Sequence, residues 1–308
     1  MENFSVTILG SSSASPTTRR NTSSQLVNFY HRLYLIDCGE GTQMQLRRNH
    51  FKLSKINHIF ISHLHGDHFF GLIGLVSSLN LFGRHKNLHI YADPRIQEIL
   101  EVQLNFSETV LRFKIIYHPL NFENKELIFE DKKLEVYSYP LDHRIPTCGF
   151  IFQEKPFLPN IKKQVIKKYS PDIHQINEIR QGNDLFLKDG THIKNKDLVI
   201  PPPAHRSYAY CSDTKFFEKL PDHLRGVELL YAECTFMNQL QQAANDKFHM
   251  TTNDVSTLAK EAKVKKLIVG HFSARYKDMT EIQEELLSLF PDAILVNDNE
   301  TFHVRESL

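Results

Sequence analysis

The sequence lacks an excess of charge of either sign. Its 308 residues hold 37 Lys and Arg against 36 Asp and Glu, a formal net charge of +1. No global field therefore marks the chain for nucleic acid or a membrane, so any basic surface must be local. Glycine and proline are also scarce, at 12 and 13 residues, which excludes a collagen-like or low-complexity protein. The 41% of hydrophobic residues indicates an ordinary globular chain.

Cysteine and long apolar runs are sparse too. The four cysteines form no C-x-x-C pair and lie in or near apolar stretches, which favours buried free thiols in a reducing compartment. The longest apolar stretch, Phe69 to Phe82, is interrupted by polar residues and is shorter than the ~20 residues that span a bilayer. Residues Met1 to Gly10 lack the basic-then-apolar pattern of a signal peptide. We therefore expect a soluble, cytoplasmic protein with no membrane segment.

Strand-like and helix-like segments alternate along the chain, which predicts an α/β fold of sheets covered by helices. The length allows two domains or one large one, and we expect a single domain over residues 1–308. The predicted strands include His58–Ser62, Tyr208–Cys211, Leu229–Glu233, Lys266–Gly270 and Ile294–Asn297. The predicted helices are Gly41–Arg48, Gly71–Leu81, Pro94–Val102, Thr252–Ala262 and Thr280–Leu289.

The composition changes in residues 154–197. Five lysines and no acidic residue fall between Lys155 and Lys168, among them Lys162 and Lys163, and prolines interrupt the start of the segment. This texture indicates an insertion or arm that projects from the core. A solvated surface excursion without any partner explains the same composition.

The strongest motif is His63-Leu64-His65-Gly66-Asp67-His68, directly after a predicted strand. Imidazole and carboxylate ligands suit zinc, iron or manganese, and these four side chains can serve two adjacent metals. Two metals need further ligands. The candidates, each just after a predicted strand, are His143, Asp213 and His271.

These residues resemble the metallo-β-lactamase superfamily, whose His-x-His-x-Asp-His motif is matched at 63–68. Within it the chain resembles the ribonuclease Z family of tRNA 3′-processing endonucleases. The segments that carry this likeness are Pro16–Asn21, Ala232–Phe236, His249–Thr251 and His271–Tyr276. The chain departs from the family pattern at Thr18, Ala232 and Cys234, and the arm has no Gly-Pro pair.

The resemblance implies a four-layer αβ/βα sandwich with 154–197 as an inserted tRNA-binding arm, or exosite. It implies one zinc ion on His63, His65 and His143, a second on Asp67, His68 and His271, and Asp213 as the bridge, with Mn or Mg possible in place of zinc. It implies Asp67 as general base, His249 as general acid and Glu233 as the residue that orients His249. Phosphate contacts are expected at Arg20, Arg206, Ser273, Arg275, Lys162 and Lys163.

The expected activity is removal of the 3′ trailer from precursor tRNA, leaving a 3′ hydroxyl on the tRNA and a 5′ phosphate on the trailer, by a homodimer. Two alternatives stay open. One is a metal-dependent phosphodiesterase that acts on a small substrate with the same fold, and the other is an RNA-binding protein without activity. Asp37, after another predicted strand, is either a support for a ligand loop or a turn residue before Gly39.

Overall fold

The computed structural model describes residues 4–187, 189–202 and 204–305, and it divides the chain into two compact units. The first unit comprises residues 1–130, 135–153 and 206–308, and the second comprises residues 131–134 and 154–205. Among the described residues, no helix combines the length and the apolar character that crossing a membrane requires.

The first unit contains two seven-stranded sheets. The strands of the first sheet, in spatial order, are β18 (Thr301–His303), β1 (Phe4–Gly10), β2 (Ser24–Phe29), β3 (Arg32–Ile36), β4 (Ile56–Phe60), β5 (Leu88–Ala92) and β6 (Ile115–Pro119). Those of the second are β17 (Ile294–Leu295), β16 (Lys266–Gly270), β15 (Leu229–Glu233), β14 (Ser207–Cys211), β9 (Thr147–Glu154), β8 (Leu134–Leu141) and β7 (Glu126–Glu130). Neighbouring strands pair in parallel from β3 through β6 in the first sheet and from β14 through β17 in the second. Burial on both faces explains why β15 and β16 read as nearly continuous apolar runs.

The two sheets pack face to face through aromatic side chains. The ring of Phe60 in β4 lies 5.6 Å from Phe150 and 5.4 Å from Phe152 in β9, and Phe152 is also 5.9 Å from Tyr34 in β3. Large rings suit this layer because they fill the gap of about 10 Å between stacked sheets.

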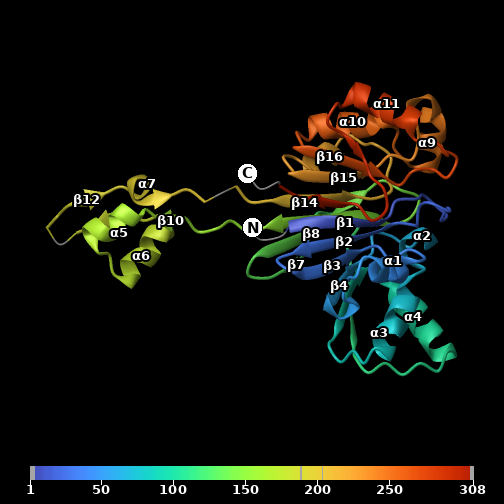
Figure 1. The fold of residues 1–308 in the computed structure, drawn as a ribbon, viewed down its shortest axis with the longest axis horizontal. Helices are drawn as coiled ribbons and strands as arrows, with labels where there is room; N and C mark the ends of the chain where they lie inside the picture. The colour runs from blue at the N-terminus through green and yellow to red at the C-terminus, as the bar shows by residue number, and fades with distance from the viewer. Residues whose placement is uncertain (1–3, 188, 203, 306–308) are drawn as a thin grey trace. The chain divides into compact units, whose positions relative to one another are not determined.

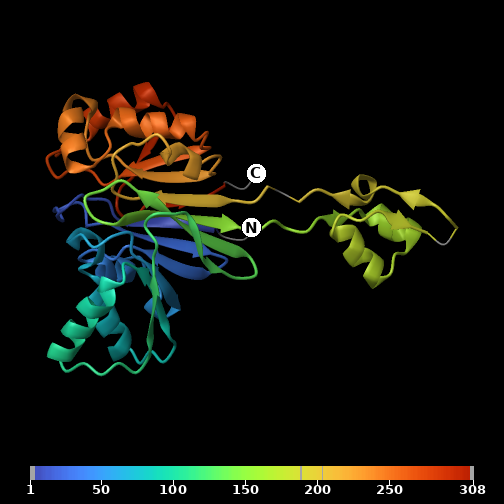
Figure 2. The same ribbon diagram turned by 180° about the vertical axis from the view of Figure 1, so that it is seen from behind.

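Helices cover the outer face of each sheet, as Figure 1 and the opposite view in Figure 2 show. One layer contains α1 (Thr42–Arg48), α2 (Gly66–Phe69), α3 (Leu72–Leu81) and α4 (Arg95–Phe106), and the other contains α8 (Leu220–His223), α9 (Gln241–Lys247), α10 (Thr252–Glu261) and α11 (Thr280–Leu289). Leu75 and Leu100 belong to the core beneath the first layer, and Leu258 and Leu286 to the core beneath the second. The predicted α/β fold, a four-layer sandwich, is confirmed.

The second unit has a small core of its own. Its strands are β10 (Asn160–Ile161) with β13 (Val199–Ile200), and β11 (Leu185–Phe186) with β12 (His192–Ile193). Its helices are α5 (Lys163–Tyr169), α6 (Ile173–Arg180) and α7 (Asn195–Leu198). Val165, Ile179 and Leu198 are buried together, so the lysine-rich segment is folded around an apolar centre.

Candidate active site

The candidate metal ligands lie where strands end. His63 and His65 follow β4, Asp213 follows β14 and His271 follows β16. The parallel register pairs Cys211 with Ala232 and Ala232 with Val269, so the positions two residues further on, Asp213 and His271, leave the sheet at the same level. Side chains converge at this edge because the carboxyl ends of parallel strands face the same crevice.

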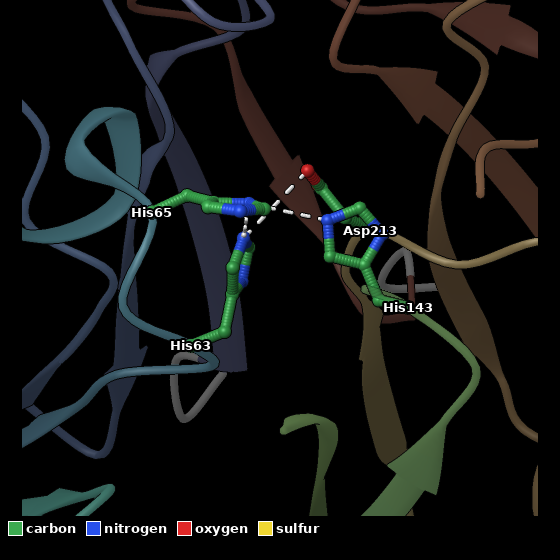
Figure 3. Close-up of side chains that lie close together, drawn as sticks. All are labelled: His63, His65, His143 and Asp213. Carbon is green, nitrogen blue, oxygen red and sulfur yellow. Dashed lines mark hydrogen bonds and ion pairs between the residues drawn. The ribbon is translucent and has the colours of Figure 1, made fainter. Parts of the chain in front are cut away.

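One group combines His63, His65, His143 and Asp213, as Figure 3 shows. The Nδ1 atom of His65 lies 3.1 Å from Nε2 of His63 and 3.1 Å from Nε2 of His143. Oδ2 of Asp213 is 3.8 Å from Nε2 of His63. Atoms that bind one tetrahedral zinc at 2.0–2.1 Å are about 3.3 Å apart, so this spacing suits a shared cation.

A second group combines Asp67, His68 and His271. Oδ2 of Asp67 is 3.5 Å from Nε2 of His68 and 3.5 Å from Nε2 of His271. The other oxygen of Asp213, Oδ1, lies 3.4 Å from His68 and 3.2 Å from His271. The two oxygens of one carboxylate therefore face the two groups.

Three buried atoms without hydrogen-bond partners in the described part of the chain indicate whether these groups suit a cation. Nε2 of His68, Nε2 of His271 and Oδ1 of Asp213 are buried and have no hydrogen-bond partner among the described residues. Buried polar atoms are nearly always partnered in proteins, because an unpartnered one costs about 1–3 kcal/mol. Three such atoms within reach of one another fit metal ligation.

The electrostatics of the two groups favour a positive ion. Burial lowers the pKa of His63, His65 and His143, so these rings are neutral with a lone pair to donate. Burial opposes ionisation of Asp213, yet the imidazoles of His271 and His68 hold the pKa of that carboxyl well below its usual range. The neutral imidazoles of the first group and the ionised carboxylate of Asp213 together attract a divalent cation.

A network behind the groups fixes their orientation. Asp37 is fully buried, and its Oδ2 lies 2.7 Å from Nδ1 of His68. The same carboxylate accepts hydrogen bonds from the Ser62 backbone N–H at 2.7 Å and from the Tyr210 hydroxyl at 2.7 Å. The supporting role that the sequence left open for Asp37 therefore has a geometric basis, and its φ of 53° also makes it a turn residue.

His249 and Glu233 form a buried pair beside the second group. Nδ1 of His249 is 2.8 Å from Oε1 of Glu233, and both side chains are almost wholly buried. Burial favours the neutral ring, but the carboxylate of Glu233 outweighs it and raises the pKa of His249 to about 9. A ring that holds its proton at neutral pH and borders the cleft can donate that proton.

The candidate phosphate-binding residues are scattered. The Arg20 guanidinium donates to Ser11 Oγ at 2.9 Å and to the Val296 carbonyl at 2.9 Å, so it fastens two loops together. Arg275 is exposed and donates to Ser273 Oγ at 3.0 Å, just after His271. Arg206 precedes β14 and packs beside Tyr30, whereas Asp213 follows the opposite end of that strand. In the second unit, Lys163 is the first residue of α5 and Lys162 is its N-cap.

The structure also contains contacts that sequence reasoning missed. The Thr235 hydroxyl donates to Oε2 of Glu233 at 2.6 Å and lies 3.0 Å from Nδ1 of His271, so it joins the proton-donating pair to the ligand set. The Ala14 N–H donates to Oδ2 of Asp67 at 2.8 Å. Thr235 lies two residues beyond Glu233, a period-two signal that could have been noticed, whereas no local pattern links Ala14 to Asp67.

Known proteins resemble the whole chain. It is 42% identical to ribonuclease Z of Phocaeicola vulgatus over 97% of this chain and 96% of that protein, and 43% identical to ribonuclease Z of Bacteroides fragilis over 97% and 98%. The crystal structure of the short form of human tRNase Z matches with a TM-score of 0.72 and 25% identity, covering 98% of this chain and 100% of the other.

A family model described as anti-Pycsar protein Apyc1 matches residues 4–160, just over half of the chain, and these residues belong to that family. The fold and the clustered histidines and aspartates define a metal-dependent hydrolase of the metallo-β-lactamase fold. Within that class the chain belongs to the ribonuclease Z family. The predicted family, the enzyme class and the activity as a tRNA endoribonuclease are confirmed.

Proposed function

We propose that the chain removes the 3′ trailer of precursor tRNA by hydrolysis at a centre of two zinc ions, leaving a 3′ hydroxyl on the tRNA and a 5′ phosphate on the trailer. The observation that carries the two-ion proposal is the position of Asp213, whose two oxygens face separate ligand groups. Imidazole-rich groups favour zinc, and Mn or Mg in its place remains a measurable alternative.

In this proposal each ion has three residues of its own. His63, His65 and His143 would hold one ion, Asp67, His68 and His271 would hold the other, and Asp213 would contribute one oxygen to each. When bound there, two such ions would lower the pKa of a water molecule to near ~7 and would place positive charge beside the phosphate oxygens. The chain contributes the rigid framework that holds the ligands, because Asp37 and Thr235 fix the far nitrogens of His68 and His271.

Two side chains of the protein transfer protons in this proposal, one as an acceptor and one as a donor. Asp67 borders the cleft as a carboxylate and serves as general base. His249 donates a proton to the departing 3′ oxygen of the tRNA. Glu233 binds Nδ1 of His249, which turns Nε2 toward the cleft and stabilises the charged ring.

Two regions of the chain contact the substrate. The arm at residues 154–197 binds tRNA through lysines that include Lys162 and Lys163, while Ser273 and Arg275 bind phosphate near the scissile bond. Arg20 supports the loop Pro16–Asn21. Arg206 lies at the end of β14 opposite the metal-ligand groups, so it would contact RNA only at a distance from the scissile bond. The enzyme acts as a homodimer in the cytoplasm, where four buried free cysteines stay reduced.

A cleavage assay on a precursor tRNA with a 3′ trailer tests the activity. We expect a cut beside the discriminator base by the wild type, and no cut by Asp67→Ala or in the presence of a chelator. Hydrolysis of a small phosphodiester without any tRNA cleavage would instead favour the small-substrate phosphodiesterase. Metal analysis by mass spectrometry should find two zinc ions per chain, and a single ion would contradict the two-ion proposal.

A salt series tests the arm. Replacing Lys162, Lys163, Lys167 and Lys168 by Ala should weaken tRNA binding and flatten the dependence of log affinity on log salt by about 0.7–0.9 per lost phosphate contact. The matched control replaces four exposed lysines of the first unit, Lys52, Lys55, Lys260 and Lys263. Equal losses in both variants, or equal losses on tRNA and on a small phosphodiester, would count against the arm.

A further inference from the structure

The cleft beside the metal ligands has side chains that the proposed chemistry does not use. It encloses about 360 Å³, and its walls include His65, Asp67, His143, Asp213 and His249. Two other wall residues, Phe70 and Arg144, neither ligate a metal nor move a proton in the scheme above. Their chemistry indicates what the cleft holds besides the scissile phosphate.

Phe70 presents a fixed aromatic surface. Its ring packs over Gly66, where an added Cβ would lie 2.2 Å from the ring, and meets the ring of Phe69 edge-on at 5.0 Å. Nevertheless, the residue is 65% exposed. A large apolar ring held in the wall of a cleft that also contains charged and imidazole side chains is suited to cover a flat apolar partner.

Arg144 presents an uncommitted positive charge. It follows His143 directly, and within the described ranges 4–187, 189–202 and 204–305 its guanidinium has no hydrogen bond or ion pair with another residue. In contrast, the guanidinium of Arg20 donates hydrogen bonds to two loops of the protein. A free guanidinium at a cleft suits a phosphate, which it can bind through two parallel hydrogen bonds.

We propose that Phe70 and Arg144 form a subsite for one unpaired nucleotide next to the scissile bond. The base stacks on the ring of Phe70, and Arg144 binds the phosphate on the far side of that nucleotide from the bond that breaks. Proteins recognise single-stranded RNA by this combination of aromatic stacking and arginine contact. The inference rests on the proposed cleavage of tRNA at this centre, and it names the residues that hold the strand there.

Phe70→Leu tests the stacking contact, since leucine keeps an apolar side chain over Gly66. Stacking of a base on an aromatic ring contributes about 1–3 kcal/mol, which corresponds to a loss of about 5- to 150-fold in kcat/KM for precursor tRNA. Phe70→Tyr should restore most of this loss. The matched control is Phe106→Leu at the end of α4, where an 89% exposed phenylalanine lies outside the cleft, and it should cleave like the wild type.

Precursors with an abasic nucleotide identify the stacked base. The wild type should lose activity when the abasic position is the discriminator or the first trailer nucleotide, and Phe70→Leu should lose nothing more on that same substrate. Arg144→Ala should lower the salt slope of binding by about 0.7–0.9, and Arg144→Lys should keep the slope but bind more weakly.

Several results would overturn the subsite. These are normal cleavage by Phe70→Leu, equal loss in Phe106→Leu, or full additivity of Phe70→Leu with both abasic positions. Metal content measured in every variant separates a damaged centre from a lost contact. Failure of the wild type to cut any precursor tRNA would refute the proposed function itself and is seen before the variants are compared.

Discussion

Replacing Asp37 by asparagine probes the metal centre without touching a ligand. In the structure one carboxylate receives Nδ1–H of His68, the Ser62 backbone N–H and the Tyr210 hydroxyl, and it is fully buried. Asparagine has the same shape, but it offers one acceptor oxygen and two N–H donors. In either orientation of the amide, its N–H₂ group therefore faces another hydrogen-bond donor, the Ser62 N–H or Nδ1–H of His68.

The orientation of the substituted amide decides which interaction is lost. If the amide oxygen faces the Ser62 N–H, the amide N–H groups face Nδ1 of His68. The proton of that ring must then move from Nδ1 to Nε2. Nε2, which faces Asp67 and Asp213, would lose the lone pair that binds a metal. If the oxygen faces His68, the Ser62 N–H is left unpartnered in the core, at a cost of about 1–3 kcal/mol. Loss of a partner behind a metal-binding histidine lowers metal affinity about 10- to 100-fold, or about 1.4–2.7 kcal/mol.

The assay is a competition titration of zinc against a chelator, read by native mass spectrometry. We expect Asp37→Asn to lose affinity for one of its two zinc equivalents, with the ion at His63, His65 and His143 retained more tightly. Cleavage activity should recover as zinc is raised. Wild-type affinity for both equivalents would refute the reasoning that Asp37 fixes the tautomer of His68.

The other predictions test proton transfer, helix capping and metal dependence. His249→Ala should lower kcat about 10²- to 10⁴-fold at unchanged metal content, and Glu233→Gln should shift the pH profile of kcat; a decline in metal content alone would contradict the acid role. Thr251→Ala removes the capping hydrogen bond to the Asp254 N–H and should lower the free energy of unfolding by about 0.5–2 kcal/mol in a urea titration; no change would mean that solvent replaces the cap. A chelator should lower Tm, and readded zinc at about 100 times its Kd should restore about 2.7 kcal/mol of stability; an unchanged Tm would contradict a metal that binds the folded chain preferentially.

The sequence predicts the inner strands well. Leu229–Glu233 and Lys266–Gly270 have the same bounds in the structure, because strands covered on both faces appear as uninterrupted apolar runs. The capping box at Thr251 and Asp254 likewise fixes the start of α10. Helix ends are less certain, since α4 continues to Phe106, beyond the predicted end at Val102.

Half-exposed and short elements were missed. The edge strand β7, Glu126–Glu130, is exposed at both ends, and only Ile128 and Phe129 are half-buried, so its sequence carries little apolar signal. The short helix α2, Gly66–Phe69, lies inside the metal-binding motif, where glycine and histidine are poor helix formers. The composition of the second unit predicts no helix, although Asp172 and Gln175 form a capping box at the start of α6.

The candidate ligand positions can be predicted from the sequence because the ends of buried strands can be predicted. His143, Asp213 and His271 each follow a predicted strand, and the structure brings all three to the motif at 63–68. The support network was not within reach. Asp37, Ser62 and Tyr210 come from three separate strand ends or strands, so their meeting depends on how the two sheets stack.

The stacking of the two sheets also explains why Asp213 is the side chain that joins the two ligand groups. The motif at 63–68 belongs to the first sheet, whereas Asp213 and His271 belong to the second, and their positions at the same sheet level bring Oδ1 of Asp213 within 3.2 Å of Nε2 of His271. A residue at this junction can reach both groups only if it offers two donor atoms on one short side chain, which a carboxylate does and an imidazole turned toward one group does not. Asparagine at position 213 would offer one oxygen and one N–H₂ donor, so it could serve one group but not both. In the proposed two-ion centre, the geometry of the fold therefore favours a carboxylate over an amide or an imidazole at position 213, the junction of the two sheets.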